Sequence, residues 1–457
     1  MHQQDDAIEQ LTEAIVEYAV YRVRLDPPLD HCRSVAELKA ATGATITAHG
    51  IGGIEALRLF REVLAPATIS VDHTKFLSFV PAAPTEAAIL FDLVVGASSI
   101  YAGSWMEGSG AVFAENQALR WLSDLAGLPE QAGGVFVSGG TNGNLSALIA
   151  ARHQWRQASA GANDRVRGLV VASTGAHSSI ASAARAMDAD VVAIVADERG
   201  RLGGDVLRAA IKALSDDDRA RVFAIVATSG TTNAGVIDDL DGIGGAANEI
   251  GVWFHVDGAY GAAAMCSPTQ RPKFNGIERC DSFIVDPHKW LFAPFDCCAL
   301  IYRNPAIARA AHTQHAEYLD ALHVEHPGEI EWNPSDYAHH LTRRARGLPF
   351  WFSLATHGTD RYAESLDITM ALTDAVVEMI RAAPHVELLV EPDLSIVLFR
   401  RIGWTPAEYQ AWSERELLAG HAFVVPTSWA GETVLRFCFV NPLTTTAEVG
   451  DILDSMR

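Results

Sequence analysis

The sequence predicts an α/β protein: a three-layer domain built on a mostly parallel sheet, followed by a smaller α+β domain. From about residue 86 to 310, short apolar runs alternate with helix-like stretches, as in parallel βα units. In the last part of the chain, two strand-like runs lie beside helical stretches. We therefore divide the chain into residues 1–85, 86–345 and 346–457.

The first segment is expected to be helical. Apolar residues recur there at helical spacing: Ile8, Leu11, Ile15 and Tyr18. The pair Pro27-Pro28 ends this helix. A second helix is expected from Gly53 to Leu64.

The middle segment supplies the sheet. Six apolar runs are expected to be strands: Gly134–Val137, Gly168–Ala172, Val191–Ala196, Val222–Ala227, Gly251–Asp257 and Cys280–Val285. Helix-like stretches follow the first three: Leu145–Arg152, Ser178–Met187 and Gly204–Leu214. In the last segment, strands are expected at Leu394–Phe399 and Val434–Val440, with a helix at Pro406–Leu418. Ligands bind beyond the carboxyl ends of strands in open α/β sheets, so the active residues should follow strands.

Composition excludes several classes of protein. A net charge of −21 argues against a nucleic-acid partner and against an anionic membrane surface. The six cysteines are scattered apart from Cys297-Cys298, which is no disulfide framework. The start of the chain lacks a signal-peptide pattern, and no apolar run reaches the roughly 20 residues of a membrane span. We expect a soluble, cytoplasmic protein.

Lys289 lies in the most informative stretch of the chain. An apolar run leads into a Pro turn that presents His288 and Lys289 just before the bulky Trp290. Partial desolvation there should make the neutral, nucleophilic amine accessible, and such an amine forms an imine with an aldehyde. The usual aldehyde is pyridoxal phosphate (PLP), which proteins hold with a Schiff-base lysine and an acid at the pyridine nitrogen.

Asp257 is the candidate for that acid. It ends a strand-like run and precedes small residues, 32 positions before Lys289. A carboxylate facing the ring nitrogen keeps the ring protonated and able to accept electrons. Alone, an aspartate at a strand end is as readily a turn or cap residue. The nearby lysine turn favours the functional interpretation.

These two stretches closely resemble the group II PLP-dependent amino-acid decarboxylases. His255-Val-Asp-Gly-Ala-Tyr260 is similar to the family's His-Val-Asp-Ala-Ala-Tyr, and Asp286-Pro-His-Lys-Trp290 to its Asn-Pro-His-Lys-Trp. The resemblance runs from about residue 70 to the end. It implies the aspartate aminotransferase-like fold (fold type I) of PLP-dependent transferases. It also implies decarboxylation of an L-amino acid, aromatic or related, to the amine and CO2 through Lys289.

The resemblance also assigns the phosphate of PLP. The Gly-rich turn Ser138–Asn144 follows a strand and opens a helix, where backbone N–H groups favour an anion. By itself, such a turn is more commonly a plain loop. By resemblance, Gly140 and Thr141 bind the phosphate, and Asp286 and His288 lie on the other side of this loop.

Three more positions are assigned to the cofactor ring in the same way. His177, in Ala-His-Ser-Ser, would stack on the ring and can relay protons. Thr232 ends an Ala-Thr-Ser-Gly-Thr-Thr stretch and would lie near the ring oxygen. Ala259 would pack under the ring, where only a small side chain fits. The catalytic set is therefore Lys289, His177 and Asp257, with one tyrosine still to add.

That tyrosine is expected in residues 312–342, which match the family's mobile catalytic loop in place. There a tyrosine delivers a proton to the carbon that lost CO2. Tyr337 is our choice, and Tyr318, Trp332 or a loop histidine are the alternatives. The segment holds six histidines, but no Cys or carboxylate stands at a diagnostic spacing, so no metal site is expected.

The substrate pocket departs from the animal aromatic decarboxylases. Phe76 and Phe79 lie in a segment that resembles the family's substrate wall, as does Trp105. Tyr101 stands where those enzymes tend to have Ile. A reshaped pocket for an aromatic or related side chain is therefore expected.

The resemblance further implies a homodimer, with residues 1–85 packed across the two-fold axis. A changed pocket or loop leaves two alternatives on the same fold: an aldehyde synthase and a transaminase-like enzyme. A PLP-binding scaffold without activity is disfavoured, because Lys289, Asp257 and His177 are all present.

Overall fold

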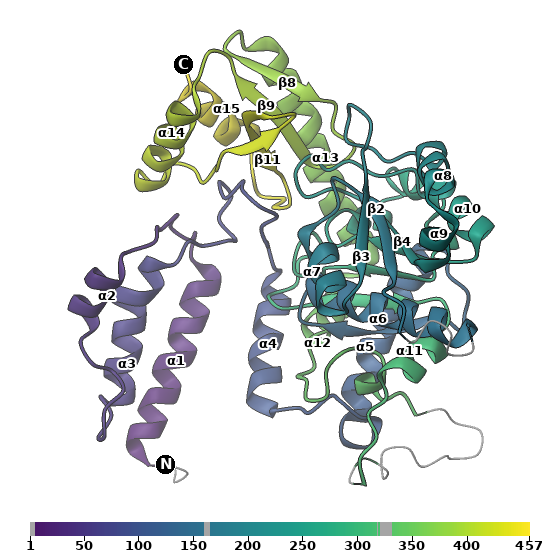
Figure 1. Cartoon of the computed structure of the whole chain (residues 1–457). Coiled ribbons are helices and arrows are strands. Elements are labelled where there is room, and N and C mark those ends of the chain that lie inside the picture. Colours follow the sequence, from purple (N-terminus) through teal and green to yellow (C-terminus); the bar gives the residue numbers. More distant parts are fainter. Residues whose placement is uncertain (1–4, 160–164, 318, 320–330) are drawn as a thin grey trace.

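The computed structural model describes residues 5–159, 165–317, 319 and 331–457. Its largest part is a seven-stranded sheet between two layers of helices (Figure 1), with strand order β1-β7-β6-β5-β4-β2-β3. All neighbouring strands are parallel except those paired with β7, which confirms the predicted mostly parallel sheet. The strands are β1 (Gly133–Val137), β2 (Leu169–Ser173), β3 (Asp190–Ile194), β4 (Val222–Thr228), β5 (Trp253–Asp257), β6 (Ser282–Val285) and β7 (Cys298–Tyr302).

Successive side chains of each strand point to opposite faces of the sheet, and helices pack against both faces. In β1, Phe136 packs into one hydrophobic cluster, while Val135 and Val137 pack into the cluster on the opposite face. Phe136 shares its cluster with helices α5 (Trp105–Leu125), α8 (Gly204–Ala213), α10 (Leu240–Ile250), α12 (Leu348–His357) and α13 (Thr359–Ala382). The other face is covered by α6 (Gly140–Ala158), α7 (Ser178–Ala186) and α11 (Pro305–His312). The short α9 (Asp216–Arg221) precedes β4.

Strand β7 was not predicted, and it is the one strand that runs against the others. It follows β6 after residues 286–297, which contain no α-helix. A parallel return needs a crossover connection, usually a helix, so this chain comes back antiparallel. The β6–β7 connection thereby stays at the carboxyl ends of the parallel strands, and it carries Lys289.

The last part of the chain forms a smaller antiparallel sheet in the order β10-β11-β9-β8. Its strands are β8 (Val386–Val390), β9 (Ile396–Arg401), β10 (Thr427–Trp429) and β11 (Glu432–Cys438). It packs with α14 (Pro406–Leu418) and α15 (Thr446–Asp454), each of which begins with a capping box. The predicted α+β character is confirmed. The division of the chain into domains at residues 85 and 345 stays a prediction.

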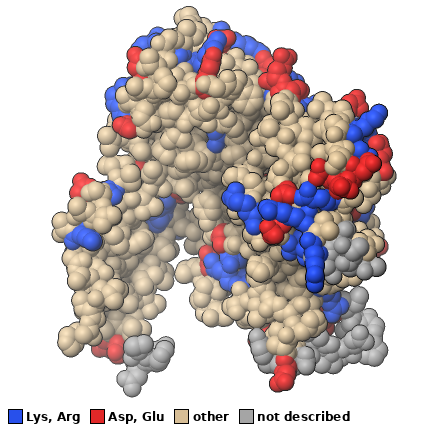
Figure 2. Space-filling view, viewed as in Figure 1, with Lys and Arg blue, Asp and Glu red and all other residues tan. Residues whose placement is uncertain are grey.

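The N-terminal helices form a separate bundle beside α4 (Glu86–Ser98) (Figure 1). They are α1 (Asp6–Arg24), α2 (Val35–Thr42) and α3 (Gly53–Leu59), which continues as a π-helix over Phe60–Leu64. No residue of α1 is buried. Most of the visible surface of this bundle carries no charge (Figure 2). None of the described helices is long and apolar enough to cross a membrane.

A buried ion pair ties α5 to the segment that precedes α12. Arg343 donates two hydrogen bonds to Glu115, at 2.7 and 2.8 Å, and their side chains are 1% and 3% exposed. Glu115→Gln would leave the guanidinium buried without its counter-charge, so we expect a loss of about 3–5 kcal/mol in the free energy of unfolding, measured in urea. The exposed pair Arg361–Glu364 is the control, and Glu364→Gln should change little. Equal effects of the two substitutions would contradict this prediction.

Candidate active site

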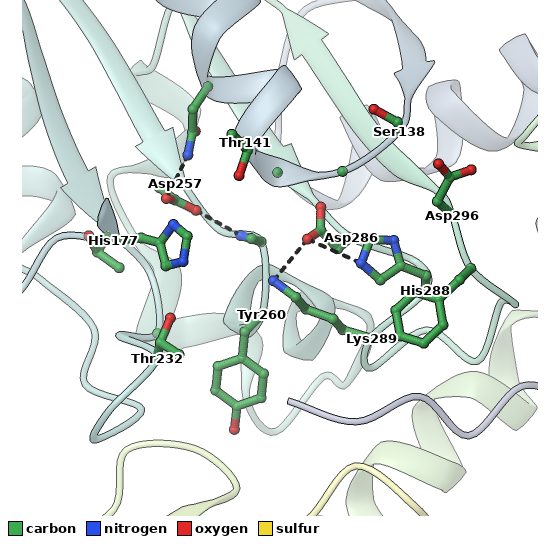
Figure 3. A pocket seen from close by; sticks show the side chains of 17 residues that line it. Ser138, Thr141, His177, Thr232, Asp257, Tyr260, Asp286, His288, Lys289 and Asp296 are labelled. Atoms are coloured by element: carbon green, nitrogen blue, oxygen red, sulfur yellow. Dashed lines mark hydrogen bonds and ion pairs between the residues drawn. The ribbon is translucent and has the colours of Figure 1, made fainter. Parts of the chain in front are cut away.

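One cavity of about 290 Å³ lies at the carboxyl ends of the parallel strands. Figure 3 shows side chains from several of these strand ends converging on it. All nine residues predicted to bind the cofactor line this cavity: Gly140, Thr141, His177, Thr232, Asp257, Ala259, Asp286, His288 and Lys289. Residues predicted from separate parts of the sequence therefore lie around one space, and their binding of the cofactor stays a prediction.

Lys289 enters the cavity from the β6–β7 connection. Its Nζ lies 2.8 Å from Oδ2 of Asp286, and Nε2 of His288 lies 3.6 Å from the same oxygen (Figure 3). Nδ1 of His288 accepts a hydrogen bond from the backbone N–H of Cys297. Trp290, the next residue, is fully buried and donates to Thr369, which anchors the turn.

The expectation that desolvation makes the neutral amine of Lys289 accessible is wrong for this arrangement. Burial does lower the pKa of Lys289, but the charge and hydrogen bond of Asp286, together with the charge of Asp257, outweigh burial, and the pKa of Lys289 is raised. The charges of Lys289 and His288 in turn overcome burial and lower the pKa of Asp286. The sequence shows the apolar neighbours of Lys289, and the prediction did not consider Asp286, three residues before it.

This pair predicts a shift in the pH at which Lys289 reacts. Asp286→Asn removes the charge that raises the pKa of Lys289 and keeps the burial that lowers it. We expect the rate of covalent PLP attachment to rise at a pH lower by about one unit or more than in the unchanged chain. Stopped-flow absorbance at roughly a dozen pH values between about 6 and 10 measures the rate of PLP attachment. Asp296→Asn, which removes a carboxylate from the same cavity wall, is the control. If the attachment rate rose at the same pH in Asp286→Asn and Asp296→Asn, the proposed effect of Asp286 on Lys289 would be disproved.

The far wall of the cavity suits a phosphate. Helix α6 begins at Gly140, and its N-cap Gly139 supplies no side-chain cap, so its first N–H groups are available to a ligand. A Cβ added at Gly140 would come within 3.3 Å of both the Ala259 Cβ and Asp286 Oδ2. A side chain at this position would therefore crowd the approach to the helix start. The hydroxyls of Ser138 and Thr141 lie on the same wall (Figure 3).

Asp257 and His177 occupy the opposite side of the cavity. Oδ1 of Asp257 accepts a hydrogen bond from Ala259 N at 3.2 Å, and Oδ2 accepts one from Asn144 Nδ2 at 2.9 Å. His177 is the N-cap of α7, and its Nδ1 accepts a hydrogen bond from Ser179 N. Thr228 Oγ1, on the cavity wall, is buried without a hydrogen-bond partner among the described residues.

These residues fit PLP. The cavity offers an amine for its carbonyl, a helix N-terminus for its phosphate and a carboxylate for its ring nitrogen. An unpaired buried hydroxyl calls for a ligand atom, because an unsatisfied polar group costs free energy. Bound PLP would be held between Lys289, the start of α6 and Asp257.

Two residues of this region were missed from the sequence. Asn144 was named only as the end of the Gly-rich turn, and its contact with Asp257 spans 113 positions. Arg436 is buried, donates Nη2 to the carbonyl of Phe79, and has no partner for Nη1 among the described residues. Burial raises the pKa of Tyr260 on the cavity wall, and the charge of Arg436 opposes part of that rise. An arginine inside the apolar run Val434–Val440 was the available signal.

The four predicted substrate residues do not line the cavity of their own chain. Phe76 is buried against Phe423, and Phe79 is 57% exposed. Tyr101 and Trp105 lie where the chain passes from α4 into α5, beside residues 333–344. Their contact with substrate therefore stays a prediction.

Tyr337 is likewise apart from the other candidates. Its ring stacks on Trp332 at 4.1 Å and is buried in the cluster under α6 and α11. Burial raises the pKa of its phenol. The structure does not bring Tyr337 to the cavity of its own chain, so its catalytic role stays a prediction. Much of the predicted mobile loop, Tyr318 included, lies outside the described residues.

Comparison with known proteins agrees with this site. A family model described as "Pyridoxal-dependent decarboxylase conserved domain" matches residues 56–402. The aromatic-L-amino-acid decarboxylase of Bacillus atrophaeus is 32% identical over 400 residues, which cover 85% of this chain and 81% of that protein. The L-2,4-diaminobutyrate decarboxylase of Rhizobium meliloti (strain 1021) is 33% identical over 381 residues, or 81% and 74% of the two chains.

A solved structure confirms the fold class. The crystal structure of Oryza sativa TDC with PLP and tryptamine has a TM-score of 0.89 to this chain at 24% identity, and the match covers 100% of this chain and 98% of the other. The family match and the fold agree with the cavity that surrounds Lys289 and Asp257. The chain therefore belongs to the PLP-dependent amino-acid decarboxylases and is a carboxy-lyase.

Proposed function

We propose that this enzyme converts an aromatic or related L-amino acid into its amine and CO2, with PLP attached to Lys289. The observation that carries the proposal is the single cavity that places the Lys289 amine, Asp257 and the start of α6 around one ligand-sized space. Relatives with aromatic and with diaminobutyrate substrates in their names are about equally similar to this chain. The aromatic class is placed first because the sequence predicts Phe76, Phe79, Tyr101 and Trp105 at the substrate pocket; none of them lines the cavity of its own chain.

Each residue has a separate task in this proposal. When bound, PLP supplies a carbonyl that amines attack and a ring that accepts electrons. Lys289 anchors the cofactor and gives way to the substrate amine. Asp257 holds the proton on the ring nitrogen, and His177 covers one ring face. Arg436 offers its unpaired N–H to the substrate carboxylate, since a guanidinium binds carboxylates well.

Product analysis tests the proposal. Purified enzyme with added PLP is given single amino acids: aromatic ones, 2,4-diaminobutyrate and glutamate. We expect stoichiometric CO2 and amine with at least one aromatic substrate. Aldehyde with ammonia would identify an aldehyde synthase, and keto acid without CO2 a transaminase-like enzyme. A spectral change without any product would identify a non-catalytic scaffold.

A second copy of the chain is the proposed partner. Apolar side chains are exposed on α1, α4 and α5, among them Ile8, Ile15, Val16, Leu93, Val94 and Phe113. An apolar surface of this kind is typical of a protein interface. A homodimer that covers this surface would also bring Tyr101 and Trp105, between α4 and α5, toward the cavity of the partner subunit.

We therefore expect light scattering to give about twice the 49.2 kDa mass of one chain. Val16→Glu, on the exposed face of α1, should weaken the dimer, because it places a charge in the apolar contact. Val206→Glu is the matched control: Val206 on α8 is 49% exposed, and Val16 is 45% exposed. An active monomer in the unchanged protein would refute the proposed assembly.

A further inference from the structure

Asp257 and His177 are joined beneath the cavity by a chain of hydrogen bonds between side chains. The chain runs from Trp253 through Ser282 and His255 to Asn144, and there it divides toward Asp257 and Ser179. Its distances are 2.8 Å for Trp253–Ser282, Ser282–His255 and His255–Asn144, and 2.9 Å for both branches from Asn144. These six side chains are all buried.

The chemistry at the Asp257 end fixes the direction of every bond back to Ser282. A carboxylate only accepts hydrogen bonds, so Asn144 must turn its NH2 group toward Asp257. Its oxygen then faces Nε2 of His255, which must carry the ring proton. Nδ1 of His255 is left as an acceptor, and it can accept only the hydroxyl proton of Ser282.

The Trp253 end is compatible with this direction. The indole N–H of Trp253 only donates, so the oxygen of Ser282 accepts from it and keeps its hydroxyl proton for Nδ1 of His255. Burial lowers the pKa of His255 to about 4, which agrees with a neutral ring bearing one proton. The Asp257 end thus assigns the tautomer of His255, and the Trp253 end agrees with it.

The second branch, from Asn144 through Ser179 to His177, has the same donor-to-acceptor direction and ends at the cavity. Asn144 donates its other amide hydrogen to Ser179, whose hydroxyl is then free to donate to Nδ1 of His177 at 2.9 Å. Nδ1 of His177 also accepts the backbone N–H of Ser179 at 3.2 Å. With Nδ1 occupied as an acceptor, a neutral His177 bears its proton on Nε2, on the side of the cavity.

We propose that Asn144 is a positioning residue that orients Asp257 and His177 together, through a one-way hydrogen-bond chain that begins at Trp253. One amide group holds the carboxylate that faces the ring nitrogen, and through Ser179 it sets which nitrogen of His177 can donate to the ligand. This inference rests on the proposed function for the tasks of Asp257 and His177. The direction of the chain does not depend on it.

Histidine tautomers in the chain without PLP give the first test. Long-range ¹H–¹⁵N spectra of histidine-labelled protein distinguish a proton on Nε2 from one on Nδ1, and His177→Gln and His255→Gln assign the signals. We expect both rings to carry the proton on Nε2. A proton on Nδ1 of either ring would overturn the proposal, even if the enzyme proves to be a decarboxylase.

Matched serine variants give the second test. Ser179→Ala removes the hydroxyl between Asn144 and His177, and we expect the Nδ1 tautomer of His177 to become detectable. Ser146→Ala is the control, because Ser146 is a fully buried serine with two hydrogen bonds on α6 that lies outside the chain. An unchanged His177 spectrum in Ser179→Ala, or the same change in both variants, would overturn the link.

Kinetics separate positioning from general stability. Asn144→Leu keeps the approximate size of the side chain and removes both donors. We expect kcat to fall about tenfold or more while KM changes by less than about threefold, because an orienting contact acts in the transition state. An unchanged kcat would overturn the role of Asn144. If this variant does not fold, the tautomers of the unchanged protein and of Ser179→Ala still decide the question.

Discussion

Lys289→Ala is expected to abolish decarboxylation, with a loss on the order of 10⁴-fold or more, because no other amine lines the described cavity to attach PLP. The rest of the cavity is unchanged by the substitution, so some PLP should still bind reversibly at the start of α6. Borohydride reduction followed by peptide mass spectrometry measures the attachment, and CO2 release measures turnover. The unchanged protein should show one reduced adduct, at Lys289.

Lys273 provides a strict control for this result. Its side chain is exposed, it donates to the carbonyl of Asp393, and desolvation lowers its pKa, whereas the pKa of Lys289 is raised. The direction of the pKa shift alone would therefore favour Lys273 over Lys289. Lys273→Ala should leave both the adduct and turnover unchanged. A reduced adduct at Lys273 in the unchanged protein would disprove the assignment of Lys289.

Asp257→Ala is expected to keep the covalent attachment and to lose turnover by about 10³-fold, since the contact with the ring nitrogen strengthens as electrons move into the ring. CO2 release under saturating PLP measures this loss. The absorbance spectrum of the bound cofactor verifies that the attachment is intact.

Asp281→Asn is the control for the loss of a strand-end carboxylate. Asp281 lies at the opposite end of the sheet, where it accepts the N–H of Phe254 at 2.8 Å, and it has no contact with the cavity. Its replacement should affect stability and leave turnover per folded molecule unchanged. Near-normal turnover in Asp257→Ala would remove the assigned role of this carboxylate.

The sequence by itself predicted nine of the residues that surround the cavity and missed others, among them Asn144. Lys289, Asp257, His177 and the Gly-rich turn each follow an apolar run, and the carboxyl ends of parallel strands meet at one edge of a sheet. Local pattern, together with the resemblance to the family, therefore brought together residues that are more than 100 positions apart. The same reasoning did not place Tyr337, because a loop residue has no strand to locate it.

The tertiary structure alone decided how these residues act on one another. It placed Asp286 against Lys289 and so reversed the expected direction of the lysine pKa shift. It ran β7 antiparallel, buried Tyr337 against Trp332, and set Asn144 between Asp257 and Ser179. The physical reason is that hydrogen-bond direction, burial and charge depend on which side chains pack together across the chain. A sequence pattern gives the spacing of residues along one strand or helix. It does not show which side chains of different strands and helices pack together.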